Sequence, residues 1–180
     1  MDMLRYALAS LLVVTTGLTG CYPGTDHLQR DGSAAAAKTQ PANGTQAVAF
    51  VRWYRGLWLG QDNFCTVDIS SQPYYLRTTF ESYNCKNDVA QSVELQNLPP
   101  GTILYVYDSP NCGETDDWGK ATVLKQAASL AVGDFNHTFT APAGLQYDGH
   151  YHNGINGKLS CFILDVPDRN GRHAGRGHDK

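Results

Sequence analysis

The chain has 180 residues, of which 42% are hydrophobic and 17% are charged. Its 14 Lys and Arg against 17 Asp and Glu give a formal net charge of -3, which argues against a nucleic-acid-binding protein because such proteins usually carry a strongly basic surface. The mean hydropathy is -0.36 and the long apolar run lies at the N-terminus, so the composition excludes a polytopic membrane protein. Ten Tyr and only two Met favour strands over packed helices.

The N-terminus has the plan of a bacterial export signal. A basic residue, Arg5, precedes a short apolar block, and small residues then lead to Cys21. The block is too short to cross a membrane as a helix. The ending Leu18-Thr19-Gly20-Cys21 resembles the bacterial lipobox, which implies that residues 1–20 are removed and that Cys21 is lipidated. An ordinary cleaved signal with a chance cysteine is the alternative.

Lipidation of Cys21 predicts where the protein lies. Several acyl chains, each buried CH₂ contributing about 0.8 kcal/mol, hold a domain firmly to a lipid bilayer. Tyr22 follows the cysteine, where a signal for retention in the inner membrane would have Asp. We therefore expect a lipid-anchored protein of the bacterial cell envelope, on the outer membrane, facing the periplasm or the cell exterior.

The remaining cysteines agree with export. They are Cys65, Cys85, Cys112 and Cys161, and an even number in an exported chain implies two disulfides. Three connectivities are possible. We favour Cys65–Cys85 and Cys112–Cys161, because each bond then closes within one of the two similar halves described below.

Composition divides the mature chain into three parts. Residues 21–46 are small and polar without an apolar period, which predicts a flexible tether. Residues 47–166 carry the strand-like segments. Residues 167–180 contain no large apolar side chain, which predicts a disordered tail.

Many short strands separated by turn signals are predicted over residues 47–166. The expected strands fall in 47–54, 64–69, 74–76, 93–95, 103–107, 121–124, 138–140 and 162–164, with a further strand near Asp148. Only 125–132 has the character of a helical turn. Strands at this spacing, bounded by Gly, Pro and Asn, predict an all-β antiparallel sandwich or barrel.

The two halves of this region resemble each other. Each begins with an aromatic strand and a bend that contains Gly, and each ends with a polar turn and a closing apolar strand. The pattern predicts two four-stranded units, over about 47–98 and 101–166, packed into one sandwich.

At these motifs the chain resembles the βγ-crystallin family, particularly its bacterial secreted members. Val106–Gly113 has the spacing of the family's aromatic-x-x-x-x-x-x-Gly hairpin, with Val in the aromatic position. The family's polar turn fits Asn87–Ser92 and Asn156–Cys161. The resemblance implies two Greek-key units that form a βγ-crystallin-like antiparallel sandwich.

The turns of that family can bind Ca²⁺, which takes several oxygen ligands. The resemblance implies side-chain ligands at Asn87, Asp88, Asn156 and Ser160, with a backbone carbonyl from Gly157. Gln91 departs from the family's Ser or Thr, as do Gly157 and Cys161 from its polar positions. The alternative is that the turns serve folding, their Asn and Ser side chains capping backbone groups.

Two other groups of polar residues could carry chemistry. Asp148, His150 and His152 alternate on an expected strand and would share a face, where they could hold Zn²⁺ or Cu²⁺ or lie on an exposed edge. Glu114, Asp116 and Asp117 form an acidic loop beside Trp118, which could act in sugar hydrolysis or be a solvated loop around a buried ring.

The segment from Arg52 to Trp58 is crowded with aromatic residues and arginine. These residue types dominate binding hot spots, although in a small sandwich Trp53 or Trp58 would more often belong to the core. Arg52 and Arg55 do not suit a core. We therefore expect this bend to be the partner-binding surface.

Together these features predict a non-catalytic binding lipoprotein. Its partner would be an envelope protein or glycan, with Ca²⁺ as a stabilising ion. One alternative is a periplasmic inhibitor or immunity lipoprotein that acts against a wall-degrading enzyme. The other is an envelope hydrolase that uses the acidic loop or the histidine face.

Overall fold

The computed structural model describes residues 48–70 and 75–174. The predicted signal peptide, Cys21 and the tether lie outside these residues. Within them, no helix has the length and apolar character needed to cross a membrane.

The described residues form strands joined by turns and two short 3₁₀ segments. The first unit contains β1 (Phe50–Tyr54), β2 (Asn63–Asp68), β3 (Tyr75–Thr79) and β4 (Ser92–Gln96), with η1 (Leu57–Leu59) after β1 and η2 (Phe80–Tyr83) after β3. The second unit contains β5 (Ile103–Tyr107), β6 (Trp118–Val123), β7 (Ser129–Val132), β8 (Phe139–Ala141), β9 (Leu145–His150) and β10 (Cys161–Asp165).

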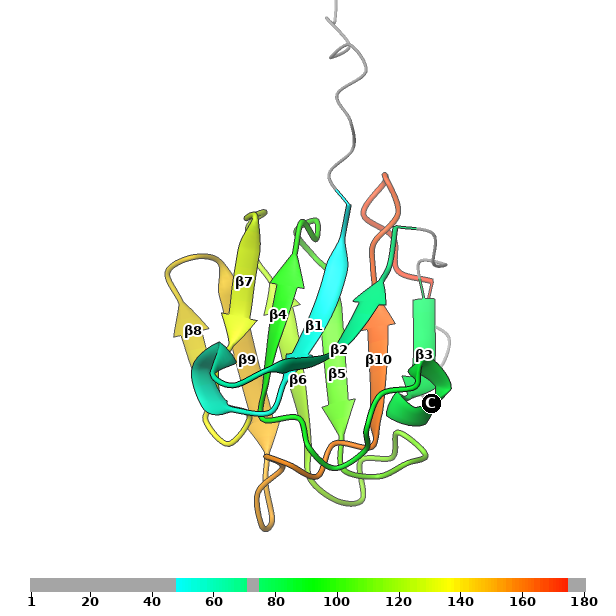
Figure 1. Ribbon diagram of the computed structural model, residues 1–180. Helices are drawn as coiled ribbons and strands as arrows, with labels where there is room; N and C mark the ends of the chain where they lie inside the picture. Colours follow the sequence, from blue (N-terminus) through cyan, green and yellow to red (C-terminus); the bar gives the residue numbers. More distant parts are fainter. Residues whose placement is uncertain (1–47, 71–74, 175–180) are drawn as a thin grey trace, which may run out of the picture. The chain divides into compact units, whose positions relative to one another are not determined.

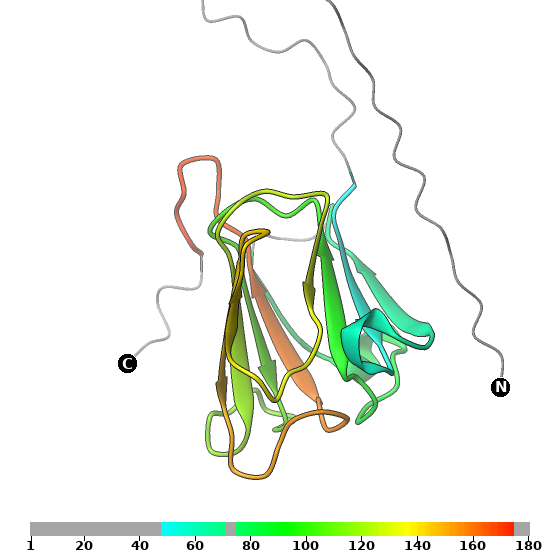
Figure 2. The same ribbon diagram turned by 90° about the vertical axis from the view of Figure 1, so that its left-hand side faces the viewer.

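The strands form two antiparallel sheets that face each other (Figures 1 and 2). One sheet has the order β2-β1-β4-β7, and the other has the order β3-β10-β5-β6-β9-β8. The all-β sandwich predicted from the sequence is therefore confirmed.

Each unit gives its third strand to the other sheet. In each sheet the closing strand of a unit, β4 or β10, returns to lie beside that unit's first strand, β1 or β5, which is the Greek-key arrangement. β3 pairs with β10 and β7 pairs with β4, so neither unit can complete a sheet without the other. The hairpin β8–β9 extends the second sheet beyond β6.

The core lies between the sheets because apolar residues alternate along most strands. Trp53 is fully buried in its centre, with its ring centroid 4.8 Å from that of Phe80 and 5.2 Å from that of Phe162. Aromatic pairs at such distances stabilise beyond the area they bury. Of the two tryptophans that the sequence placed in the core, Trp53 is there.

In the first unit, a serine closes the bend that follows β1. Ser92 lies opposite Tyr54 on the neighbouring strand β4. Its hydroxyl donates to the Gly56 carbonyl at 2.6 Å and accepts the Leu59 N–H at 3.1 Å. The side chain thereby holds both ends of the bend to the sheet.

In the second unit, a disulfide takes the place of these hydrogen bonds. Cys161 lies opposite Tyr107, as Ser92 lies opposite Tyr54, and it is bonded to Cys112. Cys112 and Leu59 stand five residues beyond these tyrosines, and both have positive φ, 51° and 58°. Cys65 is bonded to Cys85. The favoured disulfide pairing is confirmed.

The structure also bears on two expectations for particular segments. The predicted helical turn over 125–132 is wrong in its second half, because Ser129–Val132 forms β7, whose Leu130 and Val132 point inward. Of the predicted tail, residues 167–174 are described. Arg172 forms an ion pair with Asp168 at 2.8 Å, and His173 lies 3.0 Å from the buried Asp165.

Both disulfides are expected to stabilise the fold, and the one that closes the longer loop should stabilise it more. With sequence separations of 20 and 49 residues, the loss of chain entropy in the unfolded state corresponds to about 3 kcal/mol for Cys65–Cys85 and about 4 kcal/mol for Cys112–Cys161. The double variants C65S/C85S and C112S/C161S should lose these amounts in equilibrium denaturation. Unchanged denaturant midpoints in either variant would contradict this result.

Candidate functional site

The two polar turns predicted from the sequence lie side by side. Reciprocal backbone hydrogen bonds join them: Asp88 N–H donates to the Leu159 carbonyl at 3.2 Å, and Gly157 N–H donates to the Ala90 carbonyl at 2.8 Å. Asp88 and Gly157 are the second residues of their turns and both have positive φ, 57° and 74°. The structure thus brings together the residues of both turns.

Three side chains whose oxygen atoms could bind a metal ion meet at the first turn. The Ser160 hydroxyl donates to the Asp88 carboxylate at 3.2 Å and accepts from the Asn87 amide nitrogen at 3.2 Å. The amide oxygen of Asn87 is buried and has no hydrogen-bond partner among the described residues. Such an orphaned oxygen costs free energy, and a cation would satisfy it. Asn87, Asp88 and Ser160 therefore fit the oxygen chemistry that Ca²⁺ takes.

The second turn is committed to hydrogen bonds within the protein. The Asn156 amide oxygen accepts the Phe135 N–H at 3.1 Å, and its nitrogen donates to Asp134 at 2.8 Å. Burial raises the pKa of the Asp134 carboxyl, but the donors Asn136 N–H, Asn156 and His137 outweigh it and hold that pKa below its usual value. The predicted ligands therefore differ in what they can offer an ion. Among the described residues the Asn87 amide oxygen has no hydrogen-bond donor, whereas both atoms of the Asn156 amide are already hydrogen-bonded.

The two arginines of the bend have partners on their own sheet. Arg52 lies 3.9 Å from Glu94 and over the ring of Phe50 at 5.3 Å. Arg55 lies 3.3 Å from Asp62 and over the ring of Phe64 at 5.7 Å. Both side chains are partly exposed, and the charge of each is paired with a carboxylate of the same sheet region.

Glu94 is held on the outer face of the first sheet by three donors. It accepts from Ser129 at 2.6 Å, from Gln96 at 2.9 Å and from the Tyr54 hydroxyl at 2.9 Å. Burial alone would raise the pKa of Glu94, but these hydrogen bonds and the charge of Arg52 outweigh it and hold the pKa below its usual value. The carboxylate is therefore kept ionised and fully hydrogen-bonded, and its bonds to Tyr54 and Ser129 link β4 to β1 and to β7.

Trp58 is the most exposed of the large hydrophobic side chains that the structure describes, at 74%, and its neighbour Leu57 is 41% exposed. The indole lies against the backbone of Gly133 at the end of β7, where a Cβ would come within 2.1 Å of a ring carbon. One part of the ring is therefore seated on the protein while the rest faces solvent. The sequence reasoning that placed Trp58 in the core is wrong.

The backbone of the bend is held in an unfavourable conformation. Trp58, Leu59 and Gln61 all have positive φ, between 55° and 59°, a region that costs a non-glycine residue on the order of 1 kcal/mol or more. The Trp58 N–H donates to the Gly133 carbonyl at 2.7 Å, and the Leu59 N–H donates to Ser92. These bonds fix the loop that carries Trp58.

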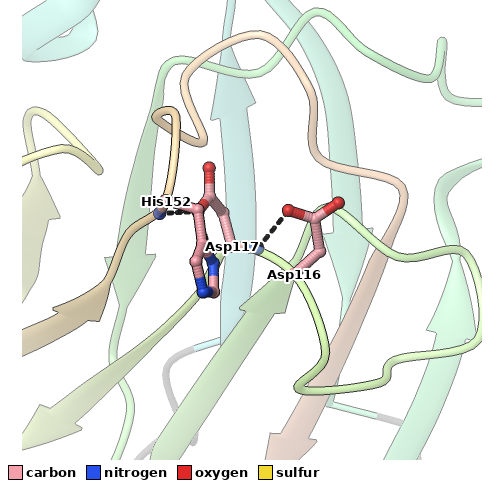
Figure 3. Close-up of side chains that lie close together, drawn as sticks. All are labelled: Asp116, Asp117 and His152. Carbon is pink, nitrogen blue, oxygen red and sulfur yellow. Dashed lines mark hydrogen bonds and ion pairs between the residues drawn. The ribbon is translucent and has the colours of Figure 1, made fainter.

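The histidine face and the acidic loop meet, though not in the combination expected from the sequence. Strand β9 ends at His150, whose ring stacks on Trp118 with centroids 3.9 Å apart. Asp148 lies opposite Lys120 in the sheet and accepts from Gln146 at 2.9 Å. His152 lies beyond the strand, near Asp117 at the end of the acidic loop (Figure 3).

Asp117 is a structural residue of that loop. Its side chain has no exposed surface, and its carboxylate accepts the backbone N–H groups of His152 and Asn153. Asp116 in turn accepts the Asp117 N–H at 2.9 Å. Asp117 is therefore not an open carboxylate of the kind that glycoside hydrolysis requires, whereas Glu114 is exposed and Asp116 is half-buried.

Comparisons with known proteins identify no relative: no protein-family model, no curated protein and no solved structure matches this chain.

Proposed function

We propose that this chain is a lipid-anchored protein of the bacterial envelope whose βγ-crystallin-like domain is a non-catalytic binding module for another envelope protein. The lipobox ending at Cys21 supports the anchor. The internal repeat and the paired turns at Asn87–Ser92 and Asn156–Cys161 support the resemblance to the family. The exposed Trp58 supports the binding role.

Trp58 is the observation on which the binding role depends. Trp and Arg are the residue types most enriched in binding hot spots, and Trp58 stands beside Leu57 with Arg55 in the same bend. A side chain that is already fixed loses little freedom when a partner covers it. A rigid bend with an exposed indole therefore suits a protein interface.

The outer face of the second sheet offers a poor surface for binding a glycan. The aromatic residues on the outer face of the second sheet lie against one another, with Tyr105–Tyr107 and Tyr107–Trp118 centroids 6.4 Å apart and His150 stacked on Trp118. Tyr107 is only 3% exposed. Since a sugar needs an open ring face on which to stack, this face of the second sheet does not suit a glycan, and the exposed side chains of the bend remain the candidate binding surface.

A wall-degrading enzyme is the second candidate for the partner. Its substrate cleft is concave, and the bend offers one protruding aromatic side chain, Trp58, with an adjacent aliphatic one, Leu57. Binding there would give the inhibitor or immunity role. Partner identification followed by an enzyme assay separates this role from other protein binding.

Replacement of Trp58 should weaken partner binding without unfolding the domain. A hot-spot side chain contributes at least about 2 kcal/mol, so W58A should weaken partner capture from solubilised envelope by about 30-fold, while W58Y should retain part of it. L124A is the matched control, because Leu124 is 45% exposed and directly follows β6 in the other sheet. Equal capture by wild type, W58A and L124A, at equal melting temperatures, would contradict the proposed interface.

Ca²⁺ should stabilise the domain through the first turn. Extracellular modules bind this ion with dissociation constants of about 0.1–1 mM, so 10 mM Ca²⁺ would stabilise by about 1.4 kcal/mol or more. The melting temperature should rise with Ca²⁺ in the wild type and in the control variant D148N, which leaves both turns unchanged, but not in D88N or N87A. A rise of equal size in N87A and the wild type, or no rise in the wild type, would remove Ca²⁺ from the proposal.

A further inference from the structure

We propose that Asp116, Asp117 and His152 form a binding site for one divalent transition-metal ion, with Zn²⁺ as the best fit to two carboxylates and an imidazole. One ligand atom from each residue lies within 4.8 Å of the others. Figure 3 shows the imidazole of His152 alongside Asp117, with the Asp116 carboxylate nearby. The site is separate from the Trp58 bend and does not depend on the proposed function.

The pairing of β6 with β9 creates this cluster. Trp118 lies opposite His150 in the register, so the residues just before β6 and just after β9 emerge at the same end of the sheet. Asp116 and Asp117 come from the first segment and His152 from the second. The Cys112–Cys161 disulfide further restrains the acidic loop.

Asp117 is positioned as a fixed ligand. It has no exposed surface, and backbone N–H groups of His152 and Asn153 orient its carboxylate. Donors of this kind fix the orientation of the carboxylate, as outer-shell groups do for the ligands of metal sites. A carboxylate has about four lone-pair sites, so these hydrogen bonds leave it able to bind an ion.

The other two side chains can move to complete the site. Zn–O and Zn–N bonds of about 2.0–2.2 Å require ligand atoms to approach one another more closely than 4.8 Å. His152 is 69% exposed, with its Nδ1 3.4 Å from the Asp117 carboxylate, and Asp116 is half-buried. Rotation of these two side chains can close the site around Asp117.

The charge around the cluster favours a cation. The backbone N–H of Asp108 donates to the Asp117 carbonyl at 3.0 Å, which brings a further acidic residue to the cluster. Lys158 is the base near these residues, and its ammonium donates to Asn153. A divalent ion would offset this excess of negative charge and join the acidic loop to the segment after β9.

The imidazole separates this site from the Ca²⁺ turn. Ca²⁺ takes oxygen ligands, whereas Zn²⁺ binds His readily and is satisfied by three protein ligands with a water in the fourth position. The two sites should therefore respond to different ions and to different substitutions.

Titration of Zn²⁺ into the untagged, chelator-treated full chain tests the site. Calorimetry should show one ion bound by the wild type, and H152A and D116N should each bind it about 100-fold more weakly. His137 provides a matched control. It is an exposed histidine whose Nδ1 lies 2.7 Å from the Asp134 carboxylate, but among the described residues it does not belong to a group of three metal-binding side chains. H137A should bind Zn²⁺ as the wild type does. Replacement of Asp117 is avoided, because it would leave the N–H groups of His152 and Asn153 without their acceptor.

Co²⁺ gives a second readout that does not depend on stability. Bound at Asp116, Asp117 and His152, it should show visible absorption bands that are lost in H152A and retained in H137A. Three results would overturn the proposal: no Zn²⁺ binding by the wild type at micromolar concentrations, equal affinity in H152A and wild type, or loss of binding in N87A with H152A unaffected.

Discussion

The hydroxyl of Ser92 holds both ends of the bend on which the proposed binding role depends. The hydroxyl donates to the Gly56 carbonyl and accepts the Leu59 N–H, and between these two residues the backbone turns through left-handed conformations. Without such bonds a bend with several non-glycine residues at positive φ would relax. With them, Trp58 is seated on Gly133 and remains 74% exposed.

The two units use one backbone plan for different purposes. At the equivalent contact the second unit has the Cys112–Cys161 disulfide, and the acidic residues Glu114, Asp116 and Asp117 follow its bend. The polar turns diverge in the same way, since Asn87 keeps an unpaired oxygen whereas Asn156 is bound to Asp134 and Phe135. Because β3 and β7 are exchanged between the sheets, both units are needed to form the core. The bends lie outside this core, so their sequences can differ without disrupting it.

Local patterns in the sequence were sufficient for the sandwich, the disulfides and the two turns, because alternation, cysteine parity and turn residues are local or countable signals. They failed where tertiary contacts decide. Nothing local distinguishes Trp53 from Trp58. The exposure of Trp58 follows from the left-handed bend and from the contact of its ring with the Gly133 backbone. The glycines that flank Leu57–Leu59 did indicate a sharp turn. Likewise, His152 was grouped with Asp148 and His150 by strand alternation, but β9 ends at His150 and the register with β6 takes His152 to Asp117 instead.

Native-state hydrogen exchange at the Trp58 and Leu59 amides tests most directly whether the bend is a rigid display for the indole. These amides lie in an exposed loop, yet they are bonded to the Gly133 carbonyl and to Ser92. If the bonds hold, both should exchange at least about 100-fold more slowly than in an unstructured peptide, and S92A should remove the protection of Leu59. Exchange of both amides at peptide rates in the wild-type protein would contradict a preformed binding bend.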